Sequence, residues 1–434
     1  MQKEISRRSF LKASVAASLA SSVGSATPLI GRDNRKVRVG FVGVGSQGTN
    51  LLRTSLAMDD IEVPAICDID PEHLGRAQRM VERRGLTKPE GYSRGPGDFK
   101  RMSAREDLDA IITATPWEWH VPVMVDAMRN GKYGCTEVPA AYTVEGCWDL
   151  VNTSEETGVP CMMLENHCYQ KNNLAVLNMV RAGLFGDLLH GECGYQHDVR
   201  FVKFGPDGEL LWRGKHSVTR NGDLYTTHGL GPVAHFMDIC RGDYFEYLTS
   251  TASRSLGLNH FVSKKFGPDH PNAKRKYALG DIVTTVIRTF KGLTITINHD
   301  TQSPRPYSNM TKIQGAKGLY NELAKSVYIE DLSPEEHRWE PFGKYQEQYN
   351  HQMWKDWEKI SKDFGHGGTD YLKLRSFYDA VRDRKPTPID IYDSVAWCVV
   401  TPLSEQSVAG GSVPVKFPDF TRGKWRTSKP VFGV

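Results

Sequence analysis

The chain has 434 residues, of which 39% are hydrophobic and 24% are charged, and its formal net charge is +4. This length is enough for two domains, and the balance of hydrophobic and charged residues is that of an ordinary folded protein. Residues 1–26 hold four basic residues and one acidic residue, which accounts for +3 of the charge and leaves the rest nearly neutral. A nearly neutral body lacks the basic face that nucleic-acid binding requires, so we expect no nucleic acid as a partner.

The N-terminus has the pattern of an export signal. The stretch SRRSFLK (6–12) is a twin-arginine pattern, and a weakly apolar run with small residues follows it to about residue 26. We therefore predict that residues 1–33 are a twin-arginine signal and linker, and that the mature protein is periplasmic. The twin-arginine translocase is then a partner during export. An uncleaved signal would instead anchor the protein to the membrane.

Eight cysteines are scattered along the chain without a Cys-x-x-Cys pair, so a structural zinc site is not expected. Several of them lie in strand-like apolar runs and are predicted to be buried free thiols. His235, Asp238, His197 and Asp198 could be drawn as metal ligands, but they show no recognised spacing. We therefore predict that the protein holds no metal.

A dinucleotide-binding motif follows the first predicted strand. The β-branched run 36–42 leads directly into GVGSQG (43–48), and a predicted helix at 49–58 comes next. In this context the glycines permit a tight turn, and a pyrophosphate can approach the free N–H groups at the start of the helix. A second strand, 62–67, ends at Asp68, 20 residues past the last glycine of the motif. An acidic residue there binds the ribose hydroxyls and repels a 2′-phosphate, so the pattern favours NAD over NADP.

Strand-like and helix-like segments continue to alternate as far as residue 164. The predicted strands are 109–115, 132–137 and 160–164, and the predicted helices between them are 118–129 and 143–157. The fold class is therefore α/β, with an N-terminal Rossmann domain expected at 34–164.

Three segments follow strands of this domain, namely PWEWH (116–120), Glu137-Val138 and ENHCY (165–169). Ligands of such folds bind at the carboxyl ends of the strands, so we expect these segments to surround one crevice. The two tryptophans and His120 suit the wall of a nicotinamide and its ribose. We expect Trp119 to pack into the core, so that Trp117 and His120 face the ligand.

From about residue 189 the pattern changes to longer strand-like runs. They are 189–195, 247–252, 281–290 and 293–299, with a hairpin turn predicted at Lys291-Gly292. These runs predict a C-terminal α+β domain at 165–434 with a large mixed or antiparallel sheet that covers the nicotinamide end. Two late helices, 370–384 and 393–409, close the chain. An open sheet face of this kind commonly pairs subunits, so a homo-oligomer is a further expectation.

The two halves together resemble the glucose–fructose oxidoreductase and inositol dehydrogenase superfamily. More narrowly, the chain resembles glycoside hydrolase family 109, the NAD-dependent α-N-acetylgalactosaminidases. The matching stretches are GVGSQG (43–48), PWEWH (116–120), EVPAA (137–141), ENHCY (165–169), GYQHD (194–198), WR (212–213), NGDLYTTHG (221–229), HPNAK (270–274), GDIVTT (280–285), RPY (305–307), GHGGTDY (365–371) and PDFTRGKW (418–425). They run in order along nearly the whole mature chain, which chance motifs would not do.

In the wider superfamily a Glu-Lys-Pro lysine helps to move a proton from the substrate hydroxyl. This chain has Val138 at that place, as the narrower family does. Ser46-Gln47, His167 and Thr226 depart from what members of the family often carry, which bears on fine substrate preference rather than on the chemistry.

The resemblance implies a glycosidase that releases terminal N-acetylgalactosamine from α-linked glycosides, with a small molecule or glycan as substrate. NAD serves as a prosthetic cofactor in transient oxidation at C3, which is followed by C2 deprotonation, elimination and water addition. Two other functions stay open. One is an NAD-dependent sugar dehydrogenase with net redox turnover, which would need a proton relay in place of Val138. The other is a non-catalytic NAD-binding sugar sensor, which would be expected to lose Tyr169 or His228.

The resemblance also implies the residues of the site. Tyr169 is the implied base at C2 and His228 the implied group for the C3 hydroxyl proton, and the two roles can be exchanged. The implied NAD contacts are Gly43, Gly45, Ser46, Gln47, Gly48, Asp68, Trp117, Glu118, Trp119, His120, Glu137, Val138, Asn166, Tyr225, Thr226, Thr227 and His228. The implied sugar contacts are Tyr195, Arg213, Tyr225 and Tyr307. His366, in the GHGG loop, could also reach the site, but a histidine there is more often a turn residue, so it is left out.

Overall fold

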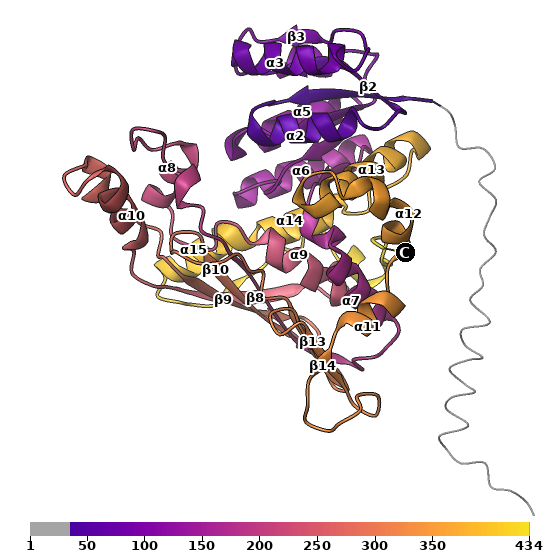
Figure 1. The fold of residues 1–434 in the computed structure, drawn as a ribbon, viewed down its shortest axis with the longest axis vertical. Coiled ribbons are helices and arrows are strands. Elements are labelled where there is room, and N and C mark those ends of the chain that lie inside the picture. Colours follow the sequence, from indigo (N-terminus) through magenta and orange to yellow (C-terminus); the bar gives the residue numbers. More distant parts are fainter. Residues whose placement is uncertain (1–34, 434) are drawn as a thin grey trace, which may run out of the picture. The chain divides into compact units, whose positions relative to one another are not determined.

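The structure is a computed structural model that describes residues 35–433, so the twin-arginine signal expected at 1–33 lies outside the described residues. The first half is a parallel sheet of six strands in the order β3-β2-β1-β4-β5-β6 (Figure 1). Its strands are β1 (Val37–Val42), β2 (Ile61–Cys67), β3 (Glu90–Tyr92), β4 (Ala110–Thr113), β5 (Tyr133–Thr136) and β6 (Cys161–Met163). This is the strand order of a dinucleotide-binding fold, so the predicted Rossmann fold is confirmed.

Helices connect these strands, as the alternation of segments predicted. They are α2 (Ser46–Ser55), α3 (Pro71–Glu82), α4 (Phe99–Ser103), α5 (His120–Arg129) and α6 (Val144–Thr157). Asp70 caps α3 by accepting two backbone N–H groups, and Pro71 takes the first helical position, where its missing N–H costs nothing. The helix predicted from residue 118 begins at His120, because Trp117–Trp119 form a separate 3-10 turn, η1.

The second half contains a mixed sheet of nine strands in the order β14-β13-β12-β11-β7-β10-β9-β8-β15. Its strands are β7 (Leu188–Gln196), β8 (Phe245–Ala252), β9 (Val283–Thr289), β10 (Thr294–Asp300), β11 (Lys312–Gly315), β12 (Gly318–Asn321), β13 (Ser326–Ile329), β14 (Glu340–Pro341) and β15 (Val415–Lys416). β7 and β10 are parallel, and the other neighbours are antiparallel. The hairpin predicted at Lys291-Gly292 joins β9 to β10, and Gly292 has the positive φ of +92° that suits glycine.

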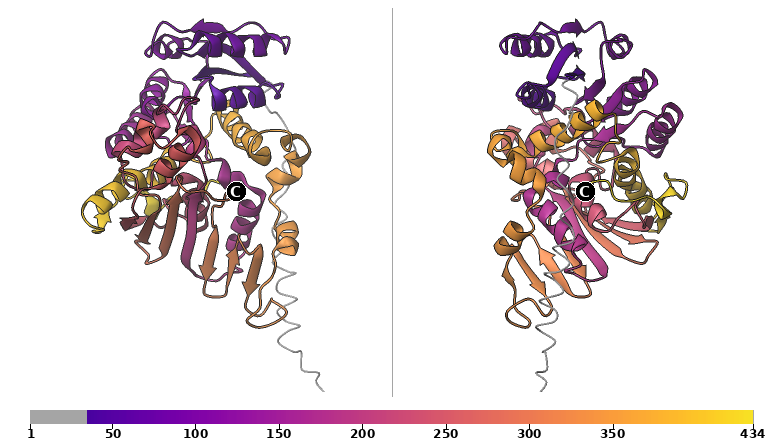
Figure 2. Two further views of the ribbon diagram at one scale, coloured as in Figure 1. Left: turned by 60° about the vertical axis from the view of Figure 1, so that its left-hand side comes forward. Right: turned by 90° about the vertical axis from the view of Figure 1, so that its right-hand side faces the viewer.

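One face of this sheet is covered and the other is open. In β9 the side chains of Val283, Thr285 and Ile287 are buried, whereas Val286 between them is 41% exposed. The helices α9 (Thr227–Phe236) and α15 (Val400–Ala409) pack against β7 and β8 (Figure 2). The alternation of buried and exposed side chains along β9 therefore reflects the burial of one sheet face against helices.

The last predicted helix, 393–409, is in fact two helices. α14 (Ile391–Cys398) ends one residue before Val399, and α15 begins at Val400. Pro402 lies in the first turn of α15, where it cannot donate a hydrogen bond to the preceding turn. A proline at this point favours a new helix start over a continuous helix.

Late helices return to the Rossmann sheet. α13 (Thr369–Asp383) packs on α2 and β1, and α14 packs on α6 and β6. The hydroxyl groups of Tyr378 and Ser55 lie 2.6 Å apart, and Arg375 and Arg382 form ion pairs with Asp60 at 2.8 and 2.6 Å. One buried apolar cluster runs from β1 through α13 and α14 to β7. The two halves therefore share a core, and segments of both can build one site.

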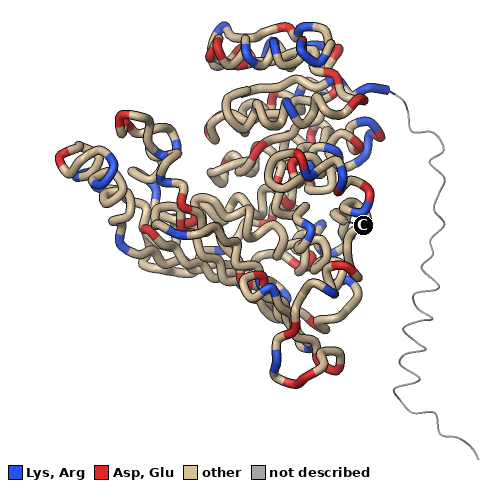
Figure 3. The backbone as a smooth tube through the Cα atoms, in the orientation of Figure 1, with Lys and Arg blue, Asp and Glu red and all other residues tan. Residues whose placement is uncertain are grey.

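The remaining helices belong to the C-terminal half. They are α7 (Lys171–Arg181), α8 (Trp212–Thr219), α10 (Gly257–Phe266), α11 (Gly343–Gln348) and α12 (Gln352–Ser361), with the 3-10 turns η2 (Asn166–Tyr169), η3 (Arg200–Val202), η4 (Pro271–Ala273), η5 (His366–Gly368) and η6 (Lys424–Arg426). Within 35–433, no helix is long and apolar enough to cross a membrane. All eight cysteines are buried and free, which confirms the prediction made for several of them. Figure 3 shows basic and acidic residues interleaved along the chain, which agrees with its small net charge.

Candidate active site

The glycine-rich turn forms a cradle at the start of α2. Gly43 has a φ of +79°, and a Cβ on Gly48 would overlap the carbonyl group of Gly43. The helix begins at Ser46, so the free N–H groups of its first turn lie beside this loop. The loop therefore offers both the close approach and the hydrogen-bond donors that a pyrophosphate needs.

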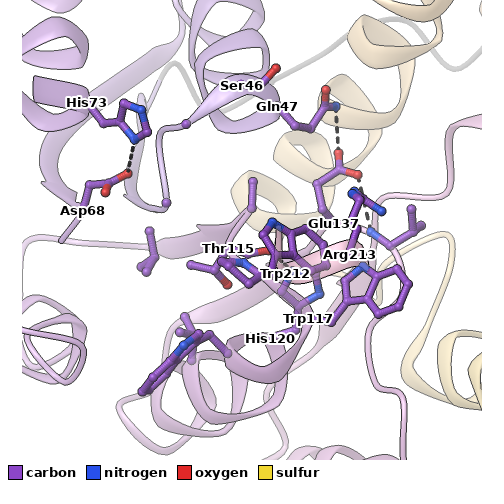
Figure 4. A pocket seen from close by; sticks show the side chains of 18 of the residues that line it. Ser46, Gln47, Asp68, His73, Thr115, Trp117, His120, Glu137, Trp212 and Arg213 are labelled. Carbon is purple, nitrogen blue, oxygen red and sulfur yellow. Dashed lines mark hydrogen bonds and ion pairs between the residues drawn. The ribbon is translucent and has the colours of Figure 1, made fainter. Parts of the chain in front are cut away.

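Asp68 directly follows β2 and lies beside the cradle (Figure 4). Its carboxylate accepts a hydrogen bond from the N–H of Val44 at 2.7 Å and another from the N–H of Asp70 at 2.9 Å. The Nδ1 of His73 is 3.8 Å from the same carboxylate. The anion is thus fixed where the ribose hydroxyls of a dinucleotide are expected, and it repels a 2′-phosphate.

A cavity of about 720 Å³ is lined by this cradle and by residues of the C-terminal half, a size that suits a cofactor site. The predicted site residues that line it are Gly43, Gly45, Ser46, Gln47, Asp68, Trp117, Trp119, His120, Glu137, Val138, Asn166, Tyr195, Arg213, Tyr225 and His228. Four predicted NAD contacts lie outside this lining. Glu118 is exposed, whereas Gly48, Thr226 and Thr227 are buried beneath the wall.

Both tryptophans of PWEWH line the cavity, which corrects the expectation for Trp119. Trp119 packs edge-on against Phe99, with 6.4 Å between ring centroids, and still contributes to the wall. Trp117 is 5% exposed and stacks on Tyr225 at 5.8 Å. Trp119 therefore serves the core and the cavity at once, since a large ring spans both.

Glu137, at the end of β5, meets a buried cation from α13. The Nζ of Lys373 lies 2.9 Å from Glu137 Oε1 and 2.9 Å from Asp370 Oδ1, and the Gln47 amide donates to the same Glu137 oxygen at 3.2 Å. Burial lowers the pKa of Lys373, but the attraction of the two carboxylates outweighs burial and holds the pKa above its ordinary value. Lys373 therefore stays charged and fixes Glu137, while Val138 presents an apolar side chain to the cavity.

Aromatic rings and a guanidinium group gather away from Asp68 (Figure 4). The rings of Tyr195 and Tyr225 are 4.7 Å apart, and the guanidinium of Arg213 lies 4.4 Å from the Trp212 ring and 5.8 Å from the Tyr225 ring. Ring faces suit the apolar faces of a sugar, and a guanidinium offers paired donors to a hydroxyl or an acetyl carbonyl. This end of the cavity is therefore suited to a sugar.

His228, in the first turn of α9, is held by a buried carboxylate. Its Nδ1 lies 2.7 Å from the Oε1 of Glu165, a side chain with no exposed surface. Burial raises the pKa of the Glu165 carboxyl, but the charge and the hydrogen bond of His228 lower it further, to about 2. Glu165 is therefore an anion that orients the imidazole, and Nε2 is the nitrogen that can exchange a proton with a ligand.

His167 lies between Tyr307 and His228, and of these three residues His228 lines the cavity. The two imidazole centroids are 4.4 Å apart. Burial and the charge of His228 lower the pKa of His167 to about 3, so its ring is neutral. The Gln170 amide donates to Nδ1 at 2.7 Å, so Nε2 carries the ring proton and donates it to the Tyr307 hydroxyl at 2.7 Å. Tyr307 does not line the cavity, but its ring lies 6.1 Å from that of Tyr195.

Tyr169 lies outside the cavity, which corrects its expected position. Its side chain has no exposed surface and packs edge-on against Phe432, with 5.1 Å between ring centroids. Burial raises the pKa of its phenol well above the ordinary value. A base must reach the substrate and hold a pKa near the working pH, so this placement does not fit the implied role at C2.

Comparisons with known families cover both halves. Residues 37–165 match the oxidoreductase family, NAD-binding Rossmann fold, and residues 169–427 match the glycosyl hydrolase 109, C-terminal domain. The chain is 44% identical to an alpha-N-acetylgalactosaminidase of Tannerella forsythia, over 93% of this chain and 90% of that protein. It is also 44% identical to a glycosyl hydrolase family 109 protein of Stenotrophomonas maltophilia, over 98% of each. The chain belongs to glycosyl hydrolase family 109.

Solved structures share the fold of this family 109 protein at low identity. Levoglucosan dehydrogenase in complex with NADH and L-sorbose superposes with a TM-score of 0.67 and 18% identity, over 89% of this chain and all of that one. An NAD binding oxidoreductase from Klebsiella pneumoniae has a TM-score of 0.69 and 14% identity, over 88% of this chain and 98% of that one. These likenesses confirm the two-sheet architecture.

NAD is the cofactor of this family 109 protein, and the residues present fit it. The glycine cradle leaves room for a pyrophosphate, and the fixed carboxylate of Asp68 suits a free ribose. The cavity then continues past Glu137 toward the sugar end.

Three residues that were not assigned from the sequence also reach the family 109 site. Glu165 orients His228, Lys373 holds Glu137, and His366 lines the cavity, so its omission from the expected site is corrected. Two of them lie within the matching stretches ENHCY and GHGGTDY, and Lys373 lies two residues after the second. The family motifs thus contain or adjoin these three residues, but the partner of each side chain depends on the fold.

Proposed function

We propose that this protein releases terminal N-acetylgalactosamine from α-linked glycosides, with NAD as a prosthetic group. The positions of the carboxylates among the residues that line the cavity support this proposal. Among the described residues of the lining, the carboxylates are Asp68, Asp70 and Glu137. The first two lie beside the glycine cradle, and Glu137 is bound to Lys373.

An ordinary glycosidase needs two carboxyl groups that flank the glycosidic bond, one as the acid and one as the nucleophile or base. The described lining offers no such pair at the sugar end. The site therefore favours a route in which the bond breaks by elimination. The relative named alpha-N-acetylgalactosaminidase supports the choice of sugar.

The chain's residues have distinct tasks in this route. NAD held by the glycine cradle and Asp68 would supply a hydride acceptor for C3 of the sugar and a hydride donor for its later reduction. Tyr195, Tyr225 and Arg213 hold the sugar. His228 takes the C2 proton, because Glu165 holds its imidazole in place at the cavity, whereas Tyr169 does not line the cavity.

The test is hydrolysis of nitrophenyl α-N-acetylgalactosaminide in heavy water, with absorbance at about 340 nm followed in parallel. We expect release of nitrophenol, deuterium at C2 of the released sugar, and no accumulation of NADH. Hydrogen fully retained at C2 would contradict elimination. Accumulation of NADH without nitrophenol would instead identify a net dehydrogenase, and bound sugar without either signal would identify a sensor.

We also propose that residues 1–33 direct export through the twin-arginine pathway to the periplasm. The SRRSFLK stretch supports this, and eight buried free thiols suit a protein that folds before export. Arg7→Lys combined with Arg8→Lys should leave folded, active enzyme in the cytoplasm. Lys12→Arg is the control and should be exported normally. Equal export of the double variant would show that the segment is not such a signal.

A further inference from the structure

A small lobe forms one side of the sugar end of the cavity. This outer lobe comprises residues 200–220 and 254–279, which contain η3, α8, α10 and η4. Figure 1 shows α8 and α10 at the left edge of the molecule. The lobe has an apolar cluster of its own, whose buried members are Phe204, Leu258, Val262 and Tyr277.

The outer lobe continues the wall of the cavity toward solvent. Val202 of η3 and Arg213 of α8 line the cavity. The segment that holds Val202 packs on α10, because the guanidinium of Arg200 lies 5.1 Å from the centroid of the Phe261 ring. The side chain of Phe201, next to Val202, is 58% exposed. A ligand that extends from the sugar end on this side therefore meets the outer lobe.

The outer lobe concentrates positive charge. It contains eleven Lys and Arg residues against three Asp and Glu residues, a net charge of +8, whereas residues 35–433 together have a net charge of +1. Figure 3 shows basic residues on α10. The net charge is a sum over the whole chain and does not show such a separation. The expectation that the body of the protein lacks a basic face is therefore corrected.

Six exposed cations of the outer lobe have no acidic partner within 35–433. By contrast, Lys274 forms an ion pair with Asp269 at 2.7 Å. The six are Lys215, Arg254, Lys264, Lys265, Arg275 and Lys276. Like charges that gather without partners repel one another, and a bound anion relieves this repulsion. The charge of this surface therefore complements an anionic ligand.

The turn after α10 presents consecutive cations from a fixed backbone. The side-chain amide of Asn259 donates to the carbonyl groups of Ala273 and Arg275, at 2.9 and 2.8 Å. The turn includes the end of the HPNAK motif (270–274), to which the proposed reaction gives no task. Groups on a fixed backbone lose less conformational freedom when they bind a ligand than groups on a mobile loop do. The turn is therefore suited to binding.

We propose that the outer lobe is a binding site for an anionic aglycone, a glycan in which a sugar close to the terminal N-acetylgalactosamine carries a sulfate ester or a carboxylate. This inference rests on the function proposed above and names its substrate class. The anionic groups lie against the lysine and arginine side chains, and a sugar ring of the aglycone lies against Phe201. A glycan is favoured over nucleic acid or a membrane surface, because the lobe shares a wall with the sugar end of the cavity.

The test measures release of N-acetylgalactosamine from three α-linked disaccharide aglycones, one neutral, one sulfated and one with a carboxylate. We expect kcat/KM at low salt to be about tenfold higher on the two acidic substrates than on the neutral one, since steering by charge raises encounter rates by about 10–10³-fold. This advantage should disappear at about 1 M salt, where the Debye length is about 3 Å.

Two matched variants assign the advantage to the outer lobe. The lobe variant reverses three of its exposed charges, by Lys215→Glu, Lys264→Glu and Lys276→Glu. We expect its ratio of kcat/KM on acidic and neutral substrates to fall by about tenfold. The control variant has the same net charge but changes exposed lysines outside the lobe and the cavity lining, by Lys88→Glu, Lys416→Glu and Lys429→Glu. Its ratio should equal that of the wild type.

NAD content, measured after denaturation, verifies the fold of each variant. If the lobe variant loses NAD, glutamine replaces the same three lysines, and the ratio should still fall. Equal kcat/KM on the three disaccharide substrates, or an acidic advantage that survives in the lobe variant, would overturn this inference.

The outcomes also separate the two proposals. Binding of the wild type, but not of the lobe variant, to duplex DNA or to phosphatidylglycerol vesicles, without an advantage for acidic substrates, would assign the lobe another partner and overturn the inference. Release of nitrophenol with deuterium at C2 would still support the proposed function in that case. Absence of deuterium at C2 in the wild-type product would overturn the proposed function itself.

Discussion

The ammonium group of Lys373 lies 2.9 Å from the Oε1 of Glu137, 236 residues away along the chain. The wider superfamily pattern has its lysine at position 138, where this chain has Val138. A cation is therefore present at this strand end, but it comes from α13. Because Lys373 is fully buried and paired with two carboxylates, its task is to hold Glu137 rather than to exchange protons with a ligand.

Lys373→Met should destabilise the protein strongly. The change removes the cation from the buried Asp370 and from Glu137, whose side chain is 13% exposed, and loss of one partner of a buried ion pair costs about 3–5 kcal/mol. Denaturant unfolding measures the free energy of unfolding. Lys274→Met is the control, because Lys274 is 65% exposed and its pair with Asp269 lies at the surface, so its loss should cost less than about 1 kcal/mol. A similar loss of unfolding free energy in the two variants would contradict a structural role for Lys373.

Tyr169→Phe should retain full turnover, because the hydroxyl group lies in the core and outside the cavity. His228→Asn should lower kcat by about 10²–10⁴-fold, the usual loss for a positioned proton-transfer group. Steady-state hydrolysis of the nitrophenyl glycoside compares the two. A slow but stable Tyr169→Phe enzyme would return Tyr169 to the role of base, and would require a rearrangement of η2.

We expect the free energy of unfolding to fall in acid, because the ion pair of Glu165 with His228 is lost there. The folded pKa of its carboxyl, about 2, lies below the ordinary value of 4.5, so its pair with His228 stabilises the protein above pH 4.5. That stabilisation is lost as pH falls from 4.5 toward 2, and it amounts to about 3 kcal/mol over the whole window.

Glu165→Gln should therefore flatten this part of the stability curve, measured by urea unfolding at a series of pH values. Glu358→Gln removes an exposed pair with Lys171 and should leave the curve unchanged. If the free energy of unfolding of Glu165→Gln falls as steeply between pH 4.5 and 2 as that of the wild type, other carboxyl groups cause the loss of stability in acid.

Asp68→Asn should weaken discrimination against NADP. The carboxylate beside the cradle repels a 2′-phosphate, and its neutral amide does not. We expect wild-type protein to release NAD on denaturation, and the variant to raise its NADP-to-NAD affinity ratio by about tenfold, which corresponds to about 1.4 kcal/mol. Chromatography of the released cofactor and titration of stripped protein measure this. Asp59→Asn, an exposed position outside the cavity, should change neither result.

Much of the fold could be predicted because its signals are local. The Gly43–Gly48 turn, the Lys291-Gly292 hairpin and the long strands of both halves appear within a few residues of their predicted places. Short elements were missed. The strand β3 lies in a Gly/Pro-rich stretch, and β11 to β14 have two to four residues each, too few to show an alternation.

The sequence by itself determined the cofactor cradle, the acidic residue after β2 and the family, because a turn, a strand end and a run of motifs are properties of neighbouring residues. Only the tertiary structure decided which side chains face the ligand. Tyr169 and His167 lie in one 3-10 turn, yet Tyr169 points into the core while His167 lies against His228. His366 reaches the cavity, and Lys373 meets Glu137, because α13 packs back on the Rossmann sheet. Side-chain direction and long-range ion pairs follow from packing between distant elements, which no local pattern records.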